Sequence, residues 1–244
     1  MSTSSNLSVR LVRNATVLVT VSETTFLVDP LFAAPGDLPP IQNTPNDRSN
    51  PLVPLPDIEL SYDAVAVTHR HPDHFDEAAT EELDADVPLF CQPVEADAFG
   101  DDGFTDVRPV DDEVSFDGVT LHRTPGRHGH GQLAEEMGPV SGFIFEADKT
   151  LYLAGDTVWY DAVERTLDQF TPDMVILNGG EAQFNHGEPI TMGVEDIVAV
   201  RGATDGIVGV VHMEAINHCL LTRDELRSKT ENVHVPEDGA QISL

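Results

Sequence analysis

The chain has 244 residues, 40% of them hydrophobic, so it can bury a sizeable core and is not disordered throughout. Its 13 basic and 43 acidic residues give a formal net charge of −30, which argues against the basic surface that nucleic-acid binding requires. Two cysteines are too few for a disulfide framework, and no stretch approaches the roughly 18 apolar residues of a membrane span.

The acidic residues are scattered along the chain, which predicts a surface covered with carboxylates. Repulsion among so many like charges destabilises the folded state unless salt screens it. We therefore expect a halophilic protein of a salt-rich cytoplasm, in preference to an ordinary acidic protein that needs solubility. The first residues show neither a long apolar core nor a cleavage pattern, so a cytoplasmic location without membrane or nucleic-acid partners is predicted, and a homo-oligomer stays open.

The first third of the chain predicts β-structure followed by a long irregular segment. Short β-branched runs at 8–12, 16–21 and 24–30 are typical of strands joined by turns. Residues 31–57 are rich in Pro, Asn and Asp, too long for a simple connector and too rigid for a helix. Such a segment is either a floppy surface loop or a lid or wall over a site.

Beyond this loop, strands and helices alternate. Strands are expected at 63–68, 88–91, 114–124, 141–147, 150–155, 173–178, 206–212 and 232–235. Helices are expected at 75–83, 159–170, 191–201 (capped by Thr191) and 222–230. Hairpin strands followed by alternating strands and helices predict a layered α/β protein, and the lack of a flexible linker favours a single domain over 1–244.

Four potential metal ligands follow the strand at 63–68, in the pattern H-x-H-x-D-H. Residues two apart in extended chain point the same way, so His69 and His71 can converge on one ion. Pro72 then breaks the strand, and the turn lets Asp73 and His74 face a second ion. Stray surface histidines at a helix start are the simpler alternative, but four donors at this spacing favour Zn²⁺ or a similar metal.

The pattern resembles the signature of the metallo-β-lactamase superfamily. The resemblance implies a four-layer αββα sandwich and further ligands at the ends of later strands. The sequence offers His128 with His130 as rival, then Asp156, then His212 with His218 as rival. His128 is preferred because, in relatives with a TP-x-x-H segment, the ligand is the histidine three after the proline.

The resemblance implies two divalent ions, and each ion has three ligands of its own. The expected metal is Zn, with Mn or Fe as alternatives. The first set is His69, His71 and His128; the second is Asp73, His74 and His212; Asp156 bridges the two ions. A bridging hydroxide would then attack a small ester, lactone or phosphodiester, with Asp73 orienting it and helping proton transfer.

The segments at 150–159, 187–197 and 211–226 further resemble the small hydrolases grouped with L-ascorbate-6-phosphate lactonase. Phosphate-binding residues for that substrate are not identified, so the substrate itself is not predicted. Asp29 is either the start of a turn with Pro30 or a carboxylate that accepts the free N–H of a ligand histidine.

Other side chains near these motifs have two interpretations each. His218 is a candidate catalytic residue, as a substrate-facing donor or acid, or it serves packing; Cys219 is expected to pack as a small hydrophobe. His186 is expected to be a solvated loop residue. The remaining expectations are non-ligand roles for His130, His122 and His234, and helix-start packing for Trp159 and Tyr160.

Two other functions compete with hydrolysis as interpretations of this metal-binding pattern. A redox module of the flavodiiron type would carry Glu in the position of His71, so the sequence favours hydrolysis. A nuclease is disfavoured because the chain lacks a basic surface and an RNA-binding arm.

Overall fold

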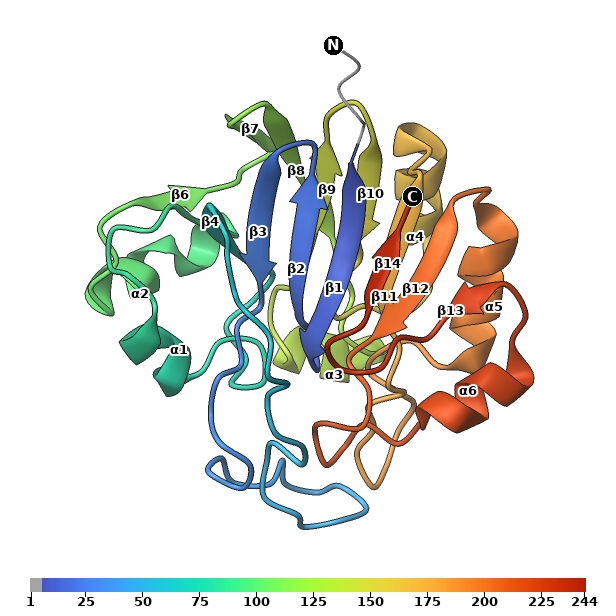
Figure 1. Ribbon diagram of the computed structural model, residues 1–244. Helices are drawn as coiled ribbons and strands as arrows, with labels where there is room; N and C mark the ends of the chain where they lie inside the picture. Colours follow the sequence, from blue (N-terminus) through green and yellow to red (C-terminus); the bar gives the residue numbers. More distant parts are fainter. Residues whose placement is uncertain (1–5) are drawn as a thin grey trace.

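The structure, a computed structural model, describes residues 6–244; the expectation for the first residues of the chain falls partly on residues 1–5, outside the described part. Its strands form two seven-stranded sheets (Figure 1). The first has the order β14 (Gln241–Ser243), β1 (Leu7–Arg13), β2 (Thr16–Val21), β3 (Thr24–Val28), β4 (Ala64–Val67), β5 (Leu89–Cys91), β6 (Val107–Pro109). The second has the order β13 (Val233–His234), β12 (Ile207–Val211), β11 (Met174–Asn178), β10 (Thr150–Leu153), β9 (Ser141–Glu146), β8 (Val119–Pro125), β7 (Glu113–Phe116).

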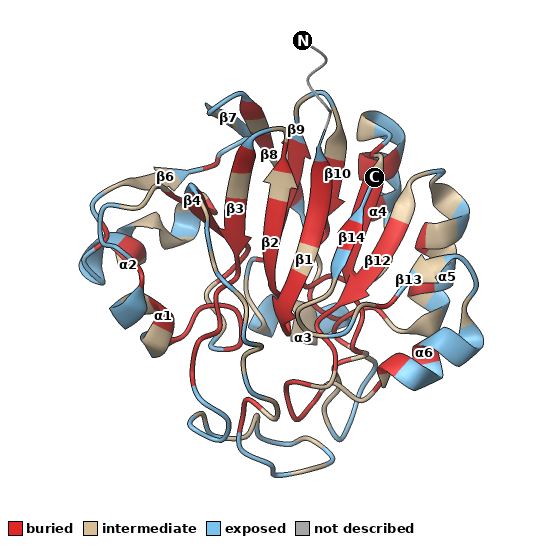
Figure 2. Ribbon diagram, in the orientation of Figure 1, coloured by how far each residue is buried: buried red, intermediate tan, exposed pale blue. Residues whose placement is uncertain are grey.

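Alternation along each strand explains why the two sheets stack. In β9, Phe143 and Phe145 belong to the core between the sheets, while Ile144 belongs to the core under the helices. In β10, Leu151 and Tyr152 divide in the same way. Successive strand residues point to opposite faces, so each sheet buries both faces and the inner strands are mostly red in Figure 2.

Helices cover the two outer faces. They are α1 (Glu77–Glu82), α2 (Ala96–Asp101), α4 (Asp161–Phe170), α5 (Val194–Ala203) and α6 (Arg223–Lys229), with a 3₁₀ turn at Pro93–Glu95. The short helix α3 (Gly131–Glu136) has no buried residue and packs on neither outer face. Ala79 of α1 and Phe99 of α2 pack on the first sheet, whereas Leu167 of α4, Ile197 of α5 and Leu226 of α6 pack on the second. The predicted αββα sandwich is confirmed. In residues 6–244 no helix has both the length and the apolarity to cross a bilayer.

Most expected elements are present, and the differences are local. The expectation that Thr191 caps a helix is wrong: α5 begins after Gly193, and the Thr191 hydroxyl instead accepts from the Ala182 amide at 2.9 Å. The single run at 114–124 is a hairpin, β7 and β8, because Asp117 and Gly118 both have positive φ and reverse the chain. Short elements such as α2, α3, β6 and β14 carry too little periodicity to be predicted.

The segment at 31–57 contains neither helix nor strand and is held at its base by two buried charges. Arg13 donates to the carbonyls of residues 31, 33 and 53 at 2.6, 3.0 and 3.1 Å. Asp76, the N-cap of α1, accepts from the amides of Phe32 and Ala33 at 3.0 and 2.7 Å. These contacts make the segment a fixed wall at the end of the sandwich where β3, β4, β10, β11 and β12 finish (Figure 1).

Candidate metal centre

Three histidines converge at the ends of β4 and β8. His69, His71 and His128 bring one ring nitrogen each to within 4.8 Å of one another, and Nε2 of His69 lies 2.9 Å from Nδ1 of His71. The other nitrogens have oxygen partners: Nε2 of His71 lies 3.2 Å from the Met137 carbonyl, and Nδ1 of His128 lies 2.8 Å from that of Ile190. Because a carbonyl only accepts, these nitrogens carry the protons and the converging nitrogens of His71 and His128 present lone pairs.

Nδ1 of His69 is oriented by a relay. The Thr68 hydroxyl donates to Asp29 at 2.7 Å, so its oxygen is free to accept from Nδ1 of His69, 3.1 Å away. His69 Nε2 therefore also presents a lone pair toward His71. Two lone pairs facing each other at 2.9 Å repel unless a cation or a proton lies between them.

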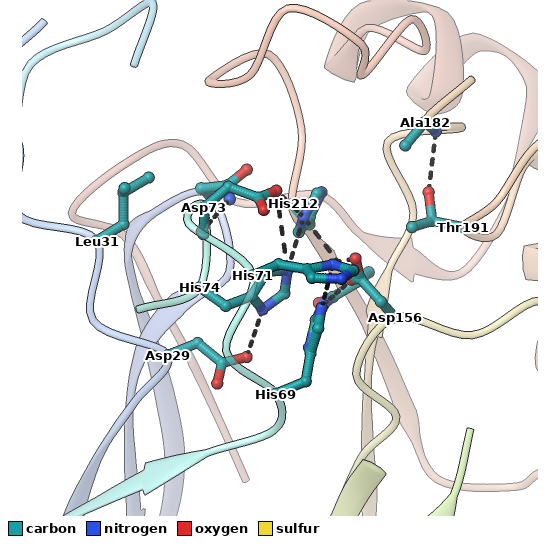
Figure 3. A network of polar contacts seen from close by, with 12 residues as sticks. Asp29, Leu31, His69, His71, Asp73, His74, Asp156, Ala182, Thr191 and His212 are labelled. Carbon is teal, nitrogen blue, oxygen red and sulfur yellow. Dashed lines mark hydrogen bonds and ion pairs between the residues drawn. The ribbon is translucent and has the colours of Figure 1, made fainter. Parts of the chain in front are cut away.

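The second group is Asp73, His74 and His212, again with ligand atoms within 4.8 Å of one another (Figure 3). The Nε2 atoms of His74 and His212 are 3.1 Å apart, and Oδ2 of Asp73 lies 3.3 Å from Nε2 of His212. Nδ1 of His74 donates to Asp29 at 2.8 Å. The carboxylate of Asp29 thus has the orienting contact that the sequence left open.

Asp156 lies between the two groups. Its Oδ2 is 3.3 Å from Nε2 of His74 and 3.4 Å from Nε2 of His128, one histidine of each group. Its Oδ1 accepts from Asn178 at 2.7 Å. A carboxylate held in this position can bridge two cations, and the donor set of imidazoles and carboxylates suits first-row metals.

Burial and charge act in opposite directions within the cluster. Burial lowers the pKa of His69 well below its usual value and also lowers that of His128. Burial acts on His74 in the same direction, but the carboxylates of Asp156, Asp29 and Asp73 outweigh it and raise the pKa to about 10. The same pairing outweighs burial for Asp73 and Asp156, whose pKa values fall well below the usual range. The cluster thus holds carboxylates with a compensating positive charge, the role that a bound cation takes.

The backbone at the strand ends is unusual. Asp29 and His212 have φ of 46° and 61°, in the left-handed region that non-glycine residues seldom occupy. Gly155, before Asp156, has φ of 67°, and a Cβ there would meet the Ser141 carbonyl oxygen at 2.5 Å. Strained positions of this kind concentrate at functional sites.

A cavity of about 190 Å³ opens beside the cluster. Its lining is Ile41, His71, Pro72, Asp73, His128, Met137, Phe184, Ile190 and His218. Ile41 comes from the 31–57 wall, so that segment contributes to the site.

Several predicted or rival residues lie elsewhere. His130 is exposed and faces Glu188 at 3.6 Å, outside the two groups. His186 is an exposed loop residue, His234 is exposed, and His122 pairs with Glu146 at 2.8 Å on the surface. Trp159 and Tyr160 immediately precede α4 and pack against the core under the helices, as expected.

Three residues at the site were missed from sequence. Cys219 was expected only to pack, but its Sγ lies 3.3 Å from Nδ1 of His212. Asn178 holds Asp156, and Asn14 donates to the Asp73 carbonyl at 2.9 Å while its own carbonyl accepts from the His212 amide at 2.8 Å. Asn178 ends a strand, as Asp156 nearly does, so its position was an available signal.

The comparisons with known proteins agree with this geometry. A family model described as Beta-lactamase superfamily domain matches residues 24–213. The UPF0173 protein YddR of Bacillus subtilis (strain 168) is 39% identical over 250 residues, covering 96% of this chain and 98% of the relative. The chain belongs to the UPF0173 family of the metallo-β-lactamase superfamily.

Two solved structures resemble this UPF0173 chain closely. An isothiocyanate hydrolase from Delia radicum gut bacteria superposes with a TM-score of 0.91 at 34% identity, covering 98% of this chain and 99% of that one. A possible metal-dependent hydrolase from Veillonella parvula DSM 2008 gives 0.92 at 34% identity, covering 98% and 100%. Other UPF0173 members are named metal-dependent hydrolases, and this chain is one too. The likeness to L-ascorbate-6-phosphate lactonases stays a prediction.

Proposed function

We propose that the chain is a dinuclear metal-dependent hydrolase, with His69, His71 and His128 holding one ion and Asp73, His74 and His212 the other. The observation that carries this proposal is the position of Asp156, whose Oδ2 lies 3.3 and 3.4 Å from one histidine nitrogen of each group. The inward lone pairs at 2.9 Å support it, because a cation removes their repulsion. The N and O donor set favours Zn²⁺, with Mn or Fe as alternatives.

When bound, two such ions supply hydroxide near neutral pH and stabilise negative charge on the substrate. The protein's own side chains would orient the attacking water, accept its proton and hold the metal ligands in place. Asp73 lines the cavity and is the group placed to orient a water and to take a proton from it. Asp29, Thr68 and Asn178 do not belong to the ligand groups, but their hydrogen bonds hold the ligands in their orientations.

Small esters and lactones are the proposed substrate class, because the cavity is small and more than half of its lining residues are apolar. Isothiocyanates are a second candidate, since the similar hydrolase named above acts on that class and matches 98% of this chain. A phosphodiester is less suited, because none of the described lining residues is Lys or Arg. The H-x-H spacing, with His71 in the first group, counts against a redox module.

The test is metal analysis of protein purified without chelator. About two divalent ions per chain are expected, and the loaded protein should hydrolyse a small uncharged ester such as 4-nitrophenyl acetate, with activity lost on chelation and regained with Zn²⁺. Protein that binds no metal under these conditions would contradict the proposal.

A further inference from the structure

His218 differs from the other buried histidines of the site because its ring has no protein partner. The residue is 5% exposed, and Nδ1 is buried without a hydrogen-bond partner among the described residues. His74 and His212, by contrast, each have a partner for Nδ1, a carboxylate and a thiol. A buried polar atom without a partner costs free energy, so packing alone does not explain a histidine at this position.

The backbone around His218 is held tightly although the ring is not. Its carbonyl accepts from the Gln183 amide at 3.0 Å, and the next amide, of Cys219, donates to Ile216 at 3.1 Å. The fixed backbone holds the His218 side chain beside the cavity that it lines, and Nδ1 of its ring has no protein partner there.

Asn217, the preceding residue, joins this segment to the 31–57 wall. Its Oδ1 accepts from the Ile41 amide and from Asn50, both at 3.0 Å, and its Nδ2 donates to Thr44 at 2.8 Å and to the Asn46 carbonyl at 2.9 Å. Two walls of the cavity, Ile41 and His218, are therefore fixed to each other through one buried amide side chain.

The chemistry of the lining decides what His218 can contact. Of the polar lining residues, His71, Asp73 and His128 belong to the proposed metal groups, which leaves His218 as the remaining polar side chain of the lining in the described structure. The other lining residues are apolar. An anionic substituent would meet apolar side chains and the Asp73 carboxylate, whereas an uncharged polar group could pair with the imidazole.

We infer that His218 is a substrate-binding residue that hydrogen-bonds an uncharged heteroatom next to the reacting carbon, so that the site selects neutral substrates over anionic ones. This inference rests on the proposed hydrolytic function. Burial lowers the pKa of His218 to about 4, which is consistent with an imidazole that binds as a neutral donor or acceptor.

The experiment uses two variants, His218→Ala and His218→Asn, whose amide can stand near the position of Nδ1. The matched control is His186→Ala, which removes an exposed histidine outside the cavity. The probes are 4-nitrophenyl acetate, which is neutral, and bis(4-nitrophenyl) phosphate, which is anionic. Metal content and melting temperature are measured for every variant.

His218→Ala should keep its metal and raise KM for the neutral ester about tenfold, the size expected from losing one hydrogen bond, with His218→Asn restoring part of the loss. The parent and His186→Ala should both favour the neutral ester over the phosphodiester. Metal loss in His218→Ala, an unchanged KM and kcat, or a parent that prefers the phosphodiester would each overturn the inference. A parent that holds two ions but hydrolyses neither probe overturns the inference alone, whereas a parent without metal contradicts the proposed function.

Discussion

The carboxylate of Asp29 accepts a hydrogen bond from Nδ1 of His74 at 2.8 Å, although 45 residues separate the two in sequence. Both side chains are at most 1% exposed. The contact puts the His74 proton on Nδ1 and turns Nε2 toward His212. One carboxylate at the end of β3 therefore sets the tautomer of a histidine that follows β4, the role that partners of metal-binding histidines usually have.

Asp29→Asn should weaken metal binding by about 10- to 100-fold, because the amide lacks the charge and one of the two acceptor oxygens that hold Thr68 and His74. Affinity is measured by competition with a chromogenic chelator. Asp63→Asn is the control, since the exposed Asp63 accepts from the Thr25 amide away from the site. Equal affinity in the two variants would show that Asp29 has only a turn-forming role.

Asp156→Ala should lower kcat by several orders of magnitude while the protein stays folded, because the change removes the proposed bridge and little buried apolar surface. Turnover and circular dichroism are measured together. Asn185→Ala, at an exposed loop position, is the control for the handling of the variants. Activity near the parent level in a folded Asp156→Ala protein would mean that the metals lie elsewhere.

His128→Ala should lose about one metal ion per chain, whereas His130→Ala should keep both. The reason is geometric: His128 is 2% exposed and lies among the first group, while His130 is exposed and faces Glu188. Elemental analysis of both variants, purified side by side, decides between them. The reverse result would exchange the two assignments.

The sequence predicted the layered fold and the ligand candidates because both depend on local pattern. Strand runs fix which face is buried, and the spacing from His69 to His74 places four donors in one turn. It could not distinguish the two roles of Asp29, because the contact with His74 depends on how β3 and β4 pair in the sheet. That pairing is a tertiary property.

The contacts of Cys219 and Asn217 could not be predicted from the sequence, because they too depend on tertiary structure. A lone cysteine is more often a packing residue, and nothing local indicates that this thiol meets Nδ1 of His212. The composition of residues 31–57 fits both a floppy loop and a wall, because it does not reveal that Arg13 and Asn217 hold the segment. That residues 1–244 form one domain stays a prediction.

Acid should destabilise the protein through His218 in a defined pH window. Burial lowers its pKa to about 4 from about 6.5 in the unfolded chain, so between these values the unfolded chain binds a proton that the folded protein does not. The loss of stability is absent above about pH 6.5, grows as pH falls, and totals roughly 3 kcal/mol near pH 4.

Urea unfolding of the parent and of His218→Asn from pH 7.5 to 4.5 measures this effect. The free energy of unfolding of the parent should fall faster with pH than that of the variant, so the difference between them shifts in the variant's favour. Groups remote from His218 titrate alike in both proteins and cancel in the comparison. A difference that is independent of pH would show that His218 is protonated equally in the folded and unfolded states.

Salt should stabilise the fold, because a net charge of −30 with 43 acidic residues repels itself at low ionic strength. Raising the salt from 0.1 to 1 M shortens the screening length from about 10 Å to about 3 Å, which removes repulsion between carboxylates on different elements. The melting temperature should therefore rise between 0.1 and 3 M KCl.

Chelator should lower the melting temperature most at low salt, because bound cations neutralise Asp73 and Asp156 at the centre of the acidic protein. Scanning calorimetry at each salt concentration, with and without chelator, separates the two contributions. A melting temperature that stays flat or falls with KCl would refute the halophilic interpretation and leave the proposed metal centre untouched.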